Sequence, residues 1–498
     1  MSIYIVDNDI RIGEYSIATE QMLKSLLTFN NPEYHKKVAR GLWVGNTPEK
    51  ICLWQRRDRD LIVPFGMLPA LMRGRKPDDT FTNRIQPPEL AQYNSTINLY
   101  DYQQIAVEKA LKAKQGVIVA PCGAGKTMIG LAIAAAIGGR TLWLTHTQDL
   151  LRQSMERARS VYGLLPKDYG TITDGKIDIG SVITFATVQT MSKIDLVAVK
   201  NEWDVIIVDE AHHAVGSPTR LMMFYKVVSS LSARYKYGLT ATPKRSDGLS
   251  PCMYALLGEK VHEIEREDVQ DKVCPVRVQI KQTGYTPDTN EILEPDGTLN
   301  YIKLINEIIQ DQERNEMIAQ DAVKCAGTCL ILTDRVEHVK VLTRMLNTLK
   351  TQSTGIYGIM SKKARSEALA ALDCGKIKVL VATYSLAREG LDVPSLRNII
   401  MATPQKNDTI ITQSAGRVAR QAQGKEYGTI IDYEDNFGML RGWQKKREKI
   451  YIKLGYEVKW IAAKAAACGI DENDPAINLI WERWEQGEYP DAPELERR

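Results

Sequence analysis

Two series of short apolar segments constrain the fold of this chain more than any other feature of its sequence. Each segment is continuous, rich in β-branched residues and separated from the next by a helical pattern. Strands that are apolar on both faces and alternate with helices form parallel sheets covered by helices on both sides. The sequence therefore predicts two α/β domains of similar size. The first series comprises GVIVA (116–120), TLWLTH (141–146), SVITFAT (181–187), DVIIVDE (204–210) and YKYGLTAT (235–242). The second comprises GTCLILT (327–333), STGIYG (353–358), IKVLVAT (377–383), NIIMAT (398–403) and GTIIDY (428–433).

The composition fits a globular chain of several domains. At 498 residues, with 44% hydrophobic and 25% charged residues, the chain suits about two to four of them. Long apolar runs and a basic start before an apolar core are both missing, so we expect neither a membrane span nor a secretory signal. The eight cysteines form no CxxC pair, which argues against zinc and for reduced thiols in the cytoplasm. A net charge of +4 permits nucleic-acid binding without arguing for it.

The strongest local signal is a glycine-rich loop between an apolar strand and a helical segment. It runs from Ala120 to Thr127 and contains Gly123, Gly125 and Lys126. Glycines let backbone N–H groups curl around phosphate oxygens, and a helix N-terminus adds partial positive charge. We expect Lys126 to contact the phosphates of ATP and Thr127 to bind Mg²⁺. The alternative is an ordinary glycine-rich turn.

A pair of carboxylates follows the apolar segment VIIV. Asp209 and Glu210 stand there before Ala211 and His212, in the sequence DEAH. A carboxylate at the end of a strand can bind Mg²⁺, and we assign this role to Asp209. A second carboxylate can orient and deprotonate the attacking water, and we assign this general-base role to Glu210. Taken alone, these residues could equally form a polar loop after a buried strand.

With further motifs in order, the chain resembles the DEAD/DEAH-type helicases of superfamily 2 between about residues 99 and 435. The matching segments are LYDYQ (99–103), THTQDLLRQ (145–153), ATVQTM (186–191), TAT (240–242), LILTDRVEH (330–338), VATYSLAREGLDVP (381–394) and QSAGRVAR (413–420). The resemblance implies two tandem RecA-like domains. It also implies that Gln103 recognises adenine, that Gly390 and Asp392 lie near the nucleotide, and that Thr240, Thr242 and His212 couple ATP to movement.

The last of these motifs carries two arginines that we expect to take part in hydrolysis. Charge that develops on a transferred phosphoryl group can be neutralised by arginines from a second domain. Arg417 and Arg420, one helical turn apart on a predicted helix, would serve as such fingers. We expect Gln413 to contact the γ-phosphate or the water. Hydrolysis would then require the domains to close. The alternative is a solvated basic helix face.

Four threonines at predicted strand ends are candidate contacts for a nucleic-acid backbone. They are Thr145, Thr187, Thr333 and Thr383. Hydroxyl groups and backbone amides at such places suit phosphate contacts that carry no sequence information. We therefore expect sequence-independent, salt-sensitive binding. Each threonine could equally cap a helix.

Within superfamily 2, the chain resembles the DNA helicases related to the repair factor XPB and the phage recombination helicase UvsW. The predicted domains are an α+β accessory domain (1–98), RecA-like domain 1 (99–270), a linker (271–300), RecA-like domain 2 (301–435) and a mainly helical extension (436–498). The accessory domain clusters basic residues around Trp43 and Trp54, which suits a DNA-binding face. The alternative is that both tryptophans lie in a small core.

The C-terminal extension divides by charge. Its basic part, RGWQKKREKIYIKLGYEVK (441–459), could bind backbone phosphate. The alternative is an amphipathic helix that packs Trp443, Ile450 and Leu454 on the motor and leaves its lysines in solvent. Residues 471–498 are acidic.

Together these features predict an ATP- and Mg²⁺-dependent helicase or translocase that unwinds or remodels DNA in a bacterial or phage-infected cell. Two alternatives stay open. One is an RNA helicase, because the 2′-hydroxyl contacts that separate RNA from DNA are not visible in a sequence. The other is a nucleic-acid clamp gated by ATP, without productive unwinding.

Overall fold

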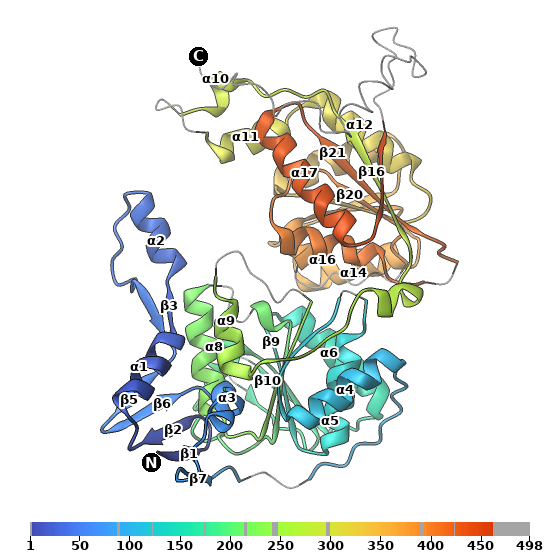
Figure 1. Ribbon diagram of the computed structural model, residues 1–498. Helices are drawn as coiled ribbons and strands as arrows, with labels where there is room; N and C mark the ends of the chain where they lie inside the picture. Colours follow the sequence, from blue (N-terminus) through green and yellow to red (C-terminus); the bar gives the residue numbers. More distant parts are fainter. Residues whose placement is uncertain are drawn as a thin grey trace. The chain divides into compact units, whose positions relative to one another are not determined.

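The computed structural model describes residues 2–86, 90–121, 123–173, 176–213, 217–241, 248–294, 299–388, 393, 395–422 and 424–461. These residues divide into two compact units, each considered by itself (Figure 1). The first unit comprises Met1–Cys274 with two later segments, Ser385–Pro394 and Ala419–Gly424, and the second unit comprises the remainder. No helix in the described ranges combines the length and the apolar composition that crossing a bilayer requires.

A largely parallel sheet forms the centre of the first unit. Its strands are β8 (Gln115–Val119), β9 (Thr141–Thr145), β10 (Tyr169–Thr173), β11 (Lys176–Ile177), β12 (Ile183–Thr187), β13 (Val205–Asp209), β14 (Tyr235–Thr240) and β15 (Lys260–Glu263). They lie in the order β11-β10-β12-β9-β13-β14-β8-β15, and only the β10–β11 pair is antiparallel. Every apolar segment of the first predicted series forms one of these strands, so the predicted parallel α/β domain is confirmed.

Helices cover both faces of this sheet. They are α4 (Asp101–Ala113), α5 (Lys126–Ile137), α6 (Gln148–Tyr162), α7 (Val188–Met191), α8 (Pro218–Ser230) and α9 (Ser250–Leu257), with 3-10 turns η2 (Ala211–His213) and η3 (Glu267–Lys272). Val117 and Val119 share one apolar core with α8 and α9, whereas Ile118 shares another with α4, α5 and α6. Because successive side chains of a strand point to opposite faces, these two groups of helices cover opposite faces of the sheet.

Residues 2–83 form the predicted small α+β domain. A five-stranded sheet in the order β5-β6-β2-β1-β7 is accompanied by a two-stranded β3–β4 ladder. The strands are β1 (Ile3–Val6), β2 (Ile10–Gly13), β3 (Thr28–Asn30), β4 (Lys50–Cys52), β5 (Gln55–Arg57), β6 (Asp60–Val63) and β7 (Thr80–Asn83). The helices are α1 (Ile17–Leu26), α2 (Pro32–Ala39) and α3 (Leu68–Arg73), with the 3-10 turn η1 (Phe65–Met67) before α3.

The two tryptophans of this domain have different surroundings. Trp54 is half-buried, its Nε1 donates to Thr28 Oγ1 (3.0 Å), and Lys24 Nζ lies 4.4 Å from its ring centroid. Trp43 is 88% exposed. The alternative of a shared small core is therefore supported for Trp54 and wrong for Trp43.

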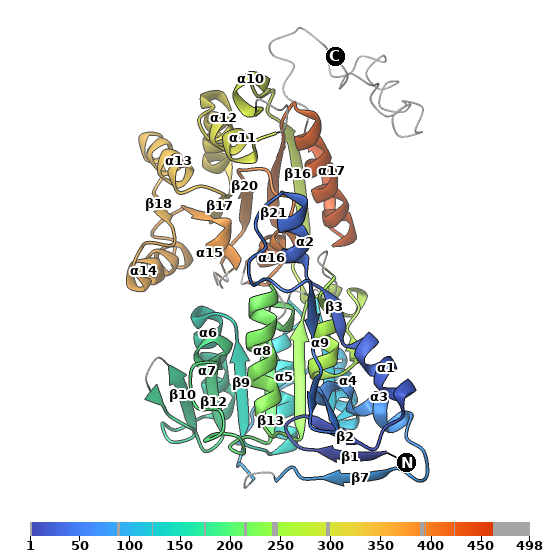
Figure 2. The ribbon, with the colours of Figure 1, turned by 90° about the vertical axis from the view of Figure 1, so that its left-hand side faces the viewer.

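The N-terminal domain shares its apolar core with the eight-stranded sheet of the first unit (Figure 1 and Figure 2). Phe65 is 2% exposed. A Cβ on Gly66 would lie 2.4 Å from Ala255 O of α9, so the two backbones touch. The buried Lys236 of β14 donates from Nζ to Asn8 O (3.1 Å) and lies 4.6 Å from the Phe65 ring centroid. The expected domain boundary at residue 98 therefore does not separate two cores.

Phe65→Ala tests this shared core. Removing a buried aromatic side chain loses its transfer free energy and leaves a cavity, so we expect the free energy of unfolding to fall by about 3–5 kcal/mol. Urea unfolding of the full chain measures this. Leu42→Ala is the control, because Leu42 is 56% exposed and its truncation should change stability by no more than about 0.5 kcal/mol. Equal stability of the two variants would contradict the shared core.

The second unit contains a seven-stranded, wholly parallel sheet. Its strands are β16 (Val276–Gln282), β17 (Cys329–Thr333), β18 (Ser353–Ile356), β19 (Val379–Thr383), β20 (Asn398–Met401), β21 (Gly428–Glu434) and β22 (Glu457–Ile461), in the order β18-β19-β17-β20-β21-β16-β22. Helices along this part of the chain are α10 (Thr289–Ile292), α11 (Tyr301–Ile308), α12 (Gln312–Lys324), α13 (Val336–Thr348), α14 (Lys362–Asp373), α15 (Tyr384–Arg388), α16 (Asp408–Val418) and α17 (Gly438–Lys453). The second predicted α/β domain is confirmed.

Two of its predicted boundaries are wrong. Residues 276–282, assigned to a linker, form β16, which pairs with β21 over its whole length. Val276, Val278 and Ile280 are buried, whereas the residues between them are not. The extension assigned to 436–498 also begins inside this unit, because α17 packs on β21 and β22 pairs with β16. Residues 462–498 lie outside the described part of the chain.

The alternative for the basic segment 441–459 is supported. Trp443 and Ile450 are half-buried on α17, as is Leu454 directly after the helix. Trp443 packs against a small apolar core together with Tyr301. Lys445 and Lys449 on the same helix are exposed. Phosphate binding by this helix stays a prediction.

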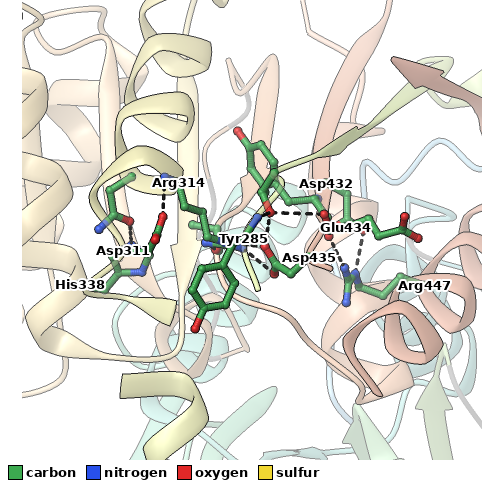
Figure 3. A network of polar contacts seen from close by, with 12 residues as sticks. Tyr285, Asp311, Arg314, His338, Asp432, Glu434, Asp435 and Arg447 are labelled. Atoms are coloured by element: carbon green, nitrogen blue, oxygen red, sulfur yellow. Dashed lines mark hydrogen bonds and ion pairs between the residues drawn. The ribbon is translucent and has the colours of Figure 1, made fainter. Parts of the chain in front are cut away.

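Buried ion pairs hold the carboxyl end of β21 (Figure 3). Arg314 of α12 contacts Asp435 at 2.8 Å, and Arg447 of α17 contacts Asp432 at 2.7 Å. All four side chains are buried. Removing one partner of such a pair costs about 3–5 kcal/mol, because the other charge stays buried without compensation. These pairs fasten α12 and α17 to the sheet.

A buried histidine extends this polar network. His338 Nε2 lies 2.8 Å from Asn315 Oδ1, and its Nδ1 lies 2.7 Å from Thr333 Oγ1. Burial and, to a lesser extent, the charge of Arg314 lower the pKa of His338 to about 3. The imidazole is therefore neutral in the folded protein at neutral pH.

His338→Gln tests this state through the pH dependence of stability. An unfolded histidine binds a proton below about pH 6.5, whereas folded His338 does so only near pH 3. Between these values the unfolded state holds more protons, so the free energy of unfolding decreases by up to about 1.4 kcal/mol for each unit by which the pH is lowered. The variant lacks this component, so its stability deficit should shrink on acidification. Urea unfolding across this range measures it, with the exposed His35→Gln as the control; a constant deficit for His338→Gln contradicts the assignment.

Candidate nucleotide-binding site

The glycine-rich loop joins the end of β8 to the start of α5. Gly123 and Gly125 adopt left-handed backbone, with φ of 89° and 76°, which side chains disfavour. A Cβ on Gly125 would lie 2.5 Å from Gln103 Nε2. Helix α5 begins at Lys126, with Thr127 in its first turn. Its N-terminal N–H groups and dipole favour an anion at this place. Cys122 lies outside the described residues.

Gln103 ties α4 to this loop. Its Nε2 donates to Ala124 O (2.9 Å), and its Oε1 accepts from Tyr100 N (3.0 Å). Gln103 is 4% exposed, so its amide group is fixed beside the loop. The predicted contact with adenine stays a prediction.

The carboxylates lie at the same edge of the sheet as the loop. β14 lies between β8 and β13, and its pairing sets Thr240 beside Val119 and Leu239 beside Asp209. Since all three strands are parallel, their carboxyl ends meet at one edge. Asp209 is the last residue of β13 and is buried. Glu210 follows with φ of 49°, a strained conformation that turns the chain sharply there.

Short contacts connect the predicted catalytic and coupling residues. Lys126 Nζ lies 3.4 Å from Glu210 Oε1, and His212 Nδ1 lies 3.4 Å from Glu210 Oε2. His212 Nδ1 also lies 2.9 Å from Thr240 Oγ1. The structure thus brings together Lys126, Glu210, His212 and Thr240, which come from three separate motifs. Thr242 lies outside the described residues.

The two adjacent carboxyl groups have opposite pKa shifts. Burial and, to a lesser extent, the charge of Glu210 raise the pKa of Asp209 to about 7. Burial also acts to raise the pKa of Glu210, but the charges of Lys126 and His212 outweigh it, and the pKa is lowered. Glu210 is therefore ionised near neutral pH, as a general base must be.

Ser154 is a site residue that the sequence analysis missed. It lies on α6, and its Oγ donates to Asp209 Oδ2 at 3.4 Å. A serine inside an amphipathic helix carries no local signal of such a contact. The packing of α6 on β9 and β12 places Ser154 beside Asp209.

The remaining predicted catalytic residues divide between the units, because Gln413 and Arg417 belong to the second unit and Arg420 to the segment Ala419–Gly424 of the first. Gln413 and Arg417 lie on α16 and are half-buried. The helix ends at Val418, so Arg420 lies beyond it. The expectation that both arginines share one helical face is therefore corrected. Gly390 and Asp392 lie outside the described residues.

The four threonines proposed for nucleic-acid contact each end a strand, as predicted. They are Thr145 of β9, Thr187 of β12, Thr333 of β17 and Thr383 of β19. All four are buried. Thr187 Oγ1 accepts from Thr190 N (3.2 Å) and caps α7, while Thr333 is bonded to His338. Local capping is thus supported for Thr187, and the nucleic-acid contacts stay predictions.

This geometry defines a class of domain. A glycine loop with left-handed residues opens onto a helix N-terminus, a lysine stands in the first turn, and two carboxylates follow a nearby parallel strand. Such a set of groups fits a nucleoside triphosphate, with Thr127 and Asp209 available to a divalent cation. The first unit is a P-loop nucleotide-binding domain.

Comparison with known proteins gives the family. Residues 96–245 match the family described as "Type III restriction enzyme, res subunit", and residues 313–422 match the "Helicase conserved C-terminal domain". The chain therefore belongs to the superfamily 2 helicases, which hydrolyse ATP. This confirms the family and the two RecA-like domains expected from the motifs.

Three relatives illustrate the similarity. "Putative ATP-dependent RNA helicase L396" of Acanthamoeba polyphaga mimivirus is 25% identical over 77% of this chain and 73% of its own length. "Probable helicase D10" of Escherichia phage T5 is 27% identical over 62% of this chain, and only 65% of its own length is spanned. "DNA 3'-5' translocase XPB2" of Sulfurisphaera tokodaii is 27% identical over 65% of this chain and 79% of its own length.

A solved structure supports the fold. The structure of Saccharomyces cerevisiae Dbp5 bound to RNA and ADP BeF3 aligns with a TM-score of 0.53 and 14% sequence identity. The alignment covers 77% of this chain and 93% of the Dbp5 chain.

Glu210→Gln tests the general-base assignment. The amide keeps the size of the side chain but cannot accept the proton of the attacking water. We expect ATP hydrolysis to fall by about 100-fold or more while nucleotide binding persists. Steady-state ATPase rates and the affinity for a fluorescent ATP analogue measure the two effects. Glu202→Gln is the control, because this carboxylate of the same unit pairs with Arg140 instead. Hydrolysis at the native rate in Glu210→Gln would refute the assignment.

Proposed function

We propose that this protein is a DNA helicase or translocase that uses ATP and Mg²⁺ to unwind or remodel duplex or branched DNA, without sequence preference. The family membership supplies the ATP-driven motor. The choice of DNA, the metal and the residue roles are the proposal.

The contact between Lys126 and Glu210 (3.4 Å) carries the proposal most directly. ATP supplies the phosphoryl group whose transfer to water drives the motor. Lys126 and the α5 N-terminus would hold its phosphates, and Thr127 and Asp209 would hold Mg²⁺. Glu210, released from Lys126 when phosphate takes its place, would accept a proton from the water.

His212 and Thr240 suit the coupling of this chemistry to movement. Their contact joins the carboxylate loop to the end of β14 (2.9 Å). A change in the charge around Glu210 would change the electrostatic interaction with His212, whose Nδ1 lies 3.4 Å from Glu210 Oε2. Gln413, Arg417 and Arg420 of the later motif would complete the site when the two domains close, by neutralising charge that develops on the phosphoryl group.

DNA is favoured over RNA by the resemblance of the motifs to the XPB-related DNA helicases, while the N-terminal domain supports the binding of either nucleic acid. One relative is named as a DNA translocase and another as an RNA helicase. The relatives' names alone therefore do not distinguish a DNA substrate from an RNA substrate. The exposed basic residues Lys36, Arg40 and Arg57 lie on the N-terminal domain, which suits phosphate binding. A clamp without turnover is disfavoured because Lys126 and Glu210 are both present and in contact.

The ATPase rate of the full chain should distinguish these functions. We expect single-stranded or forked DNA to stimulate hydrolysis and RNA to stimulate it less. The stimulation should weaken steeply with added salt, because backbone binding releases counterions. Rates are compared without nucleic acid and with each substrate at matched nucleotide concentration. Stronger stimulation by RNA would replace the DNA proposal with an RNA helicase, and no stimulation by any substrate would favour the clamp.

A further inference from the structure

We propose that Trp43 is a stacking platform for an unpaired base of a single-stranded nucleic acid, held at the mouth of a cavity between the N-terminal arm and α8. The N-terminal arm is the part of the first domain formed by β3, α2, the loop 40–49 and β4. This inference rests on the proposed function, since it names the strand that such a motor would hold. It adds a contact outside the helicase motifs.

The arm presents its indole ring to solvent. In Figure 1 the α2 end of the arm projects away from the five-stranded sheet of the N-terminal domain. Trp43 is 88% exposed, although a tryptophan side chain gains more than most by burial. The neighbouring Val38 and Leu42 are 53% and 56% exposed. Among the described residues of the first unit, the apolar side chains at this tip stay exposed.

Gly45 lies close to the indole ring of Trp43. A Cβ at Gly45 would lie 3.0 Å from Trp43 Cζ3 and 3.3 Å from two further ring atoms. The backbone of Gly45 therefore lies close to the ring, and a side chain at this position would crowd it. Its φ of 53° also falls in the left-handed region that glycine favours. The ring is thus supported by the chain while most of its surface stays open to a second flat partner.

The ring borders a cavity of about 640 Å³. The arm contributes Trp43, Asn46 and Lys50 to its lining, and α8 contributes Pro218 and Met222. Cavities of about 300–1,000 Å³ hold small organic ligands, so the volume is large enough for a nucleotide. Because the walls come from both the arm and the motor domain, a base bound there would be held against the domain that binds ATP.

The charge around the ring suits a strand with phosphates. Lys50 and Glu33 line the same cavity as Trp43, and Lys36 and Arg40 are exposed elsewhere on the arm. Lys37 is turned inward, since its Nζ donates to Thr47 Oγ1 (2.7 Å) and lies 3.5 Å from Glu33. An aromatic ring for bases beside cations for phosphates is the combination that binds single strands without sequence preference. A duplex keeps its bases stacked on one another and offers the ring no free face.

Trp43→Ala in the full chain tests the platform. Loss of one stacking contact should weaken binding of a thymidine oligonucleotide by about five-fold to 100-fold, measured by fluorescence anisotropy. Trp43→Phe keeps an aromatic face and should retain most of the affinity. Leu42→Ala is the matched control, since it removes an exposed apolar side chain beside the ring and should bind as the native chain does. Basal ATPase and the unfolding midpoint of each variant report whether it is folded.

Two further measurements separate stacking from charge. An oligonucleotide without bases should bind Trp43→Ala and the native chain equally, because stacking needs a base. Trp43→Ala should leave the slope of affinity against salt unchanged, whereas Lys36→Ala should lower it by about one. Native affinity of Trp43→Ala for the thymidine oligonucleotide, or an equal loss on the base-free strand, would overturn the platform while leaving the proposed motor intact. Failure of the native chain to bind any nucleic acid would overturn both.

Discussion

The contact between Lys126 and Glu210 is the one on which the rest of the nucleotide site depends. Several strands of the first sheet lie between the two residues in the sequence. In space, however, only β14 separates β8, which precedes the Lys126 loop, from β13, which precedes Glu210. Parallel pairing brings the carboxyl ends of β8, β14 and β13 to one edge, and the two side chains meet at 3.4 Å. A buried carboxylate without a cation would be costly. The charge of Lys126 offsets that cost and lowers the pKa of Glu210, whose second carboxylate oxygen lies 3.4 Å from His212 Nδ1.

The second unit also contains buried carboxylates, and arginines of the same unit compensate their charge. Asp432 and Asp435 stand at the carboxyl end of β21, and each receives a buried arginine from a helix, Arg447 and Arg314 respectively. These contacts explain why the chain before β17 and the chain after β21 both belong to this unit. The arginines satisfy charges that the sheet edge presents, so α12 and α17 become structural parts of the domain.

Much of this arrangement could be predicted from sequence because local patterns were strong. The apolar segments formed the expected strands, and the glycine loop and Asp209 lie at strand ends as expected. The linker prediction failed at Val276–Gln282, because its strand alternates buried and exposed residues beside a Pro- and Asp-rich stretch that dominated the interpretation. The separation of Arg420 from α16 also escaped prediction, since a helix end set by tertiary packing leaves no mark on the spacing of two arginines. Ser154 and Gly45 were missed for a similar reason: their partners are defined by three-dimensional contact alone.

The absence of a boundary between the N-terminal domain and the first motor sheet has a mechanical consequence. Phe65 and Gly66 pack against α9 and β14 with no intervening solvent layer, and Lys236 is anchored to the carbonyl of Asn8. The five-stranded sheet of the N-terminal domain and the sheet that contains the strand ending at Thr240 therefore share one packed core. A ligand bound on this domain would keep its position relative to the phosphate loop, because both are built on that core.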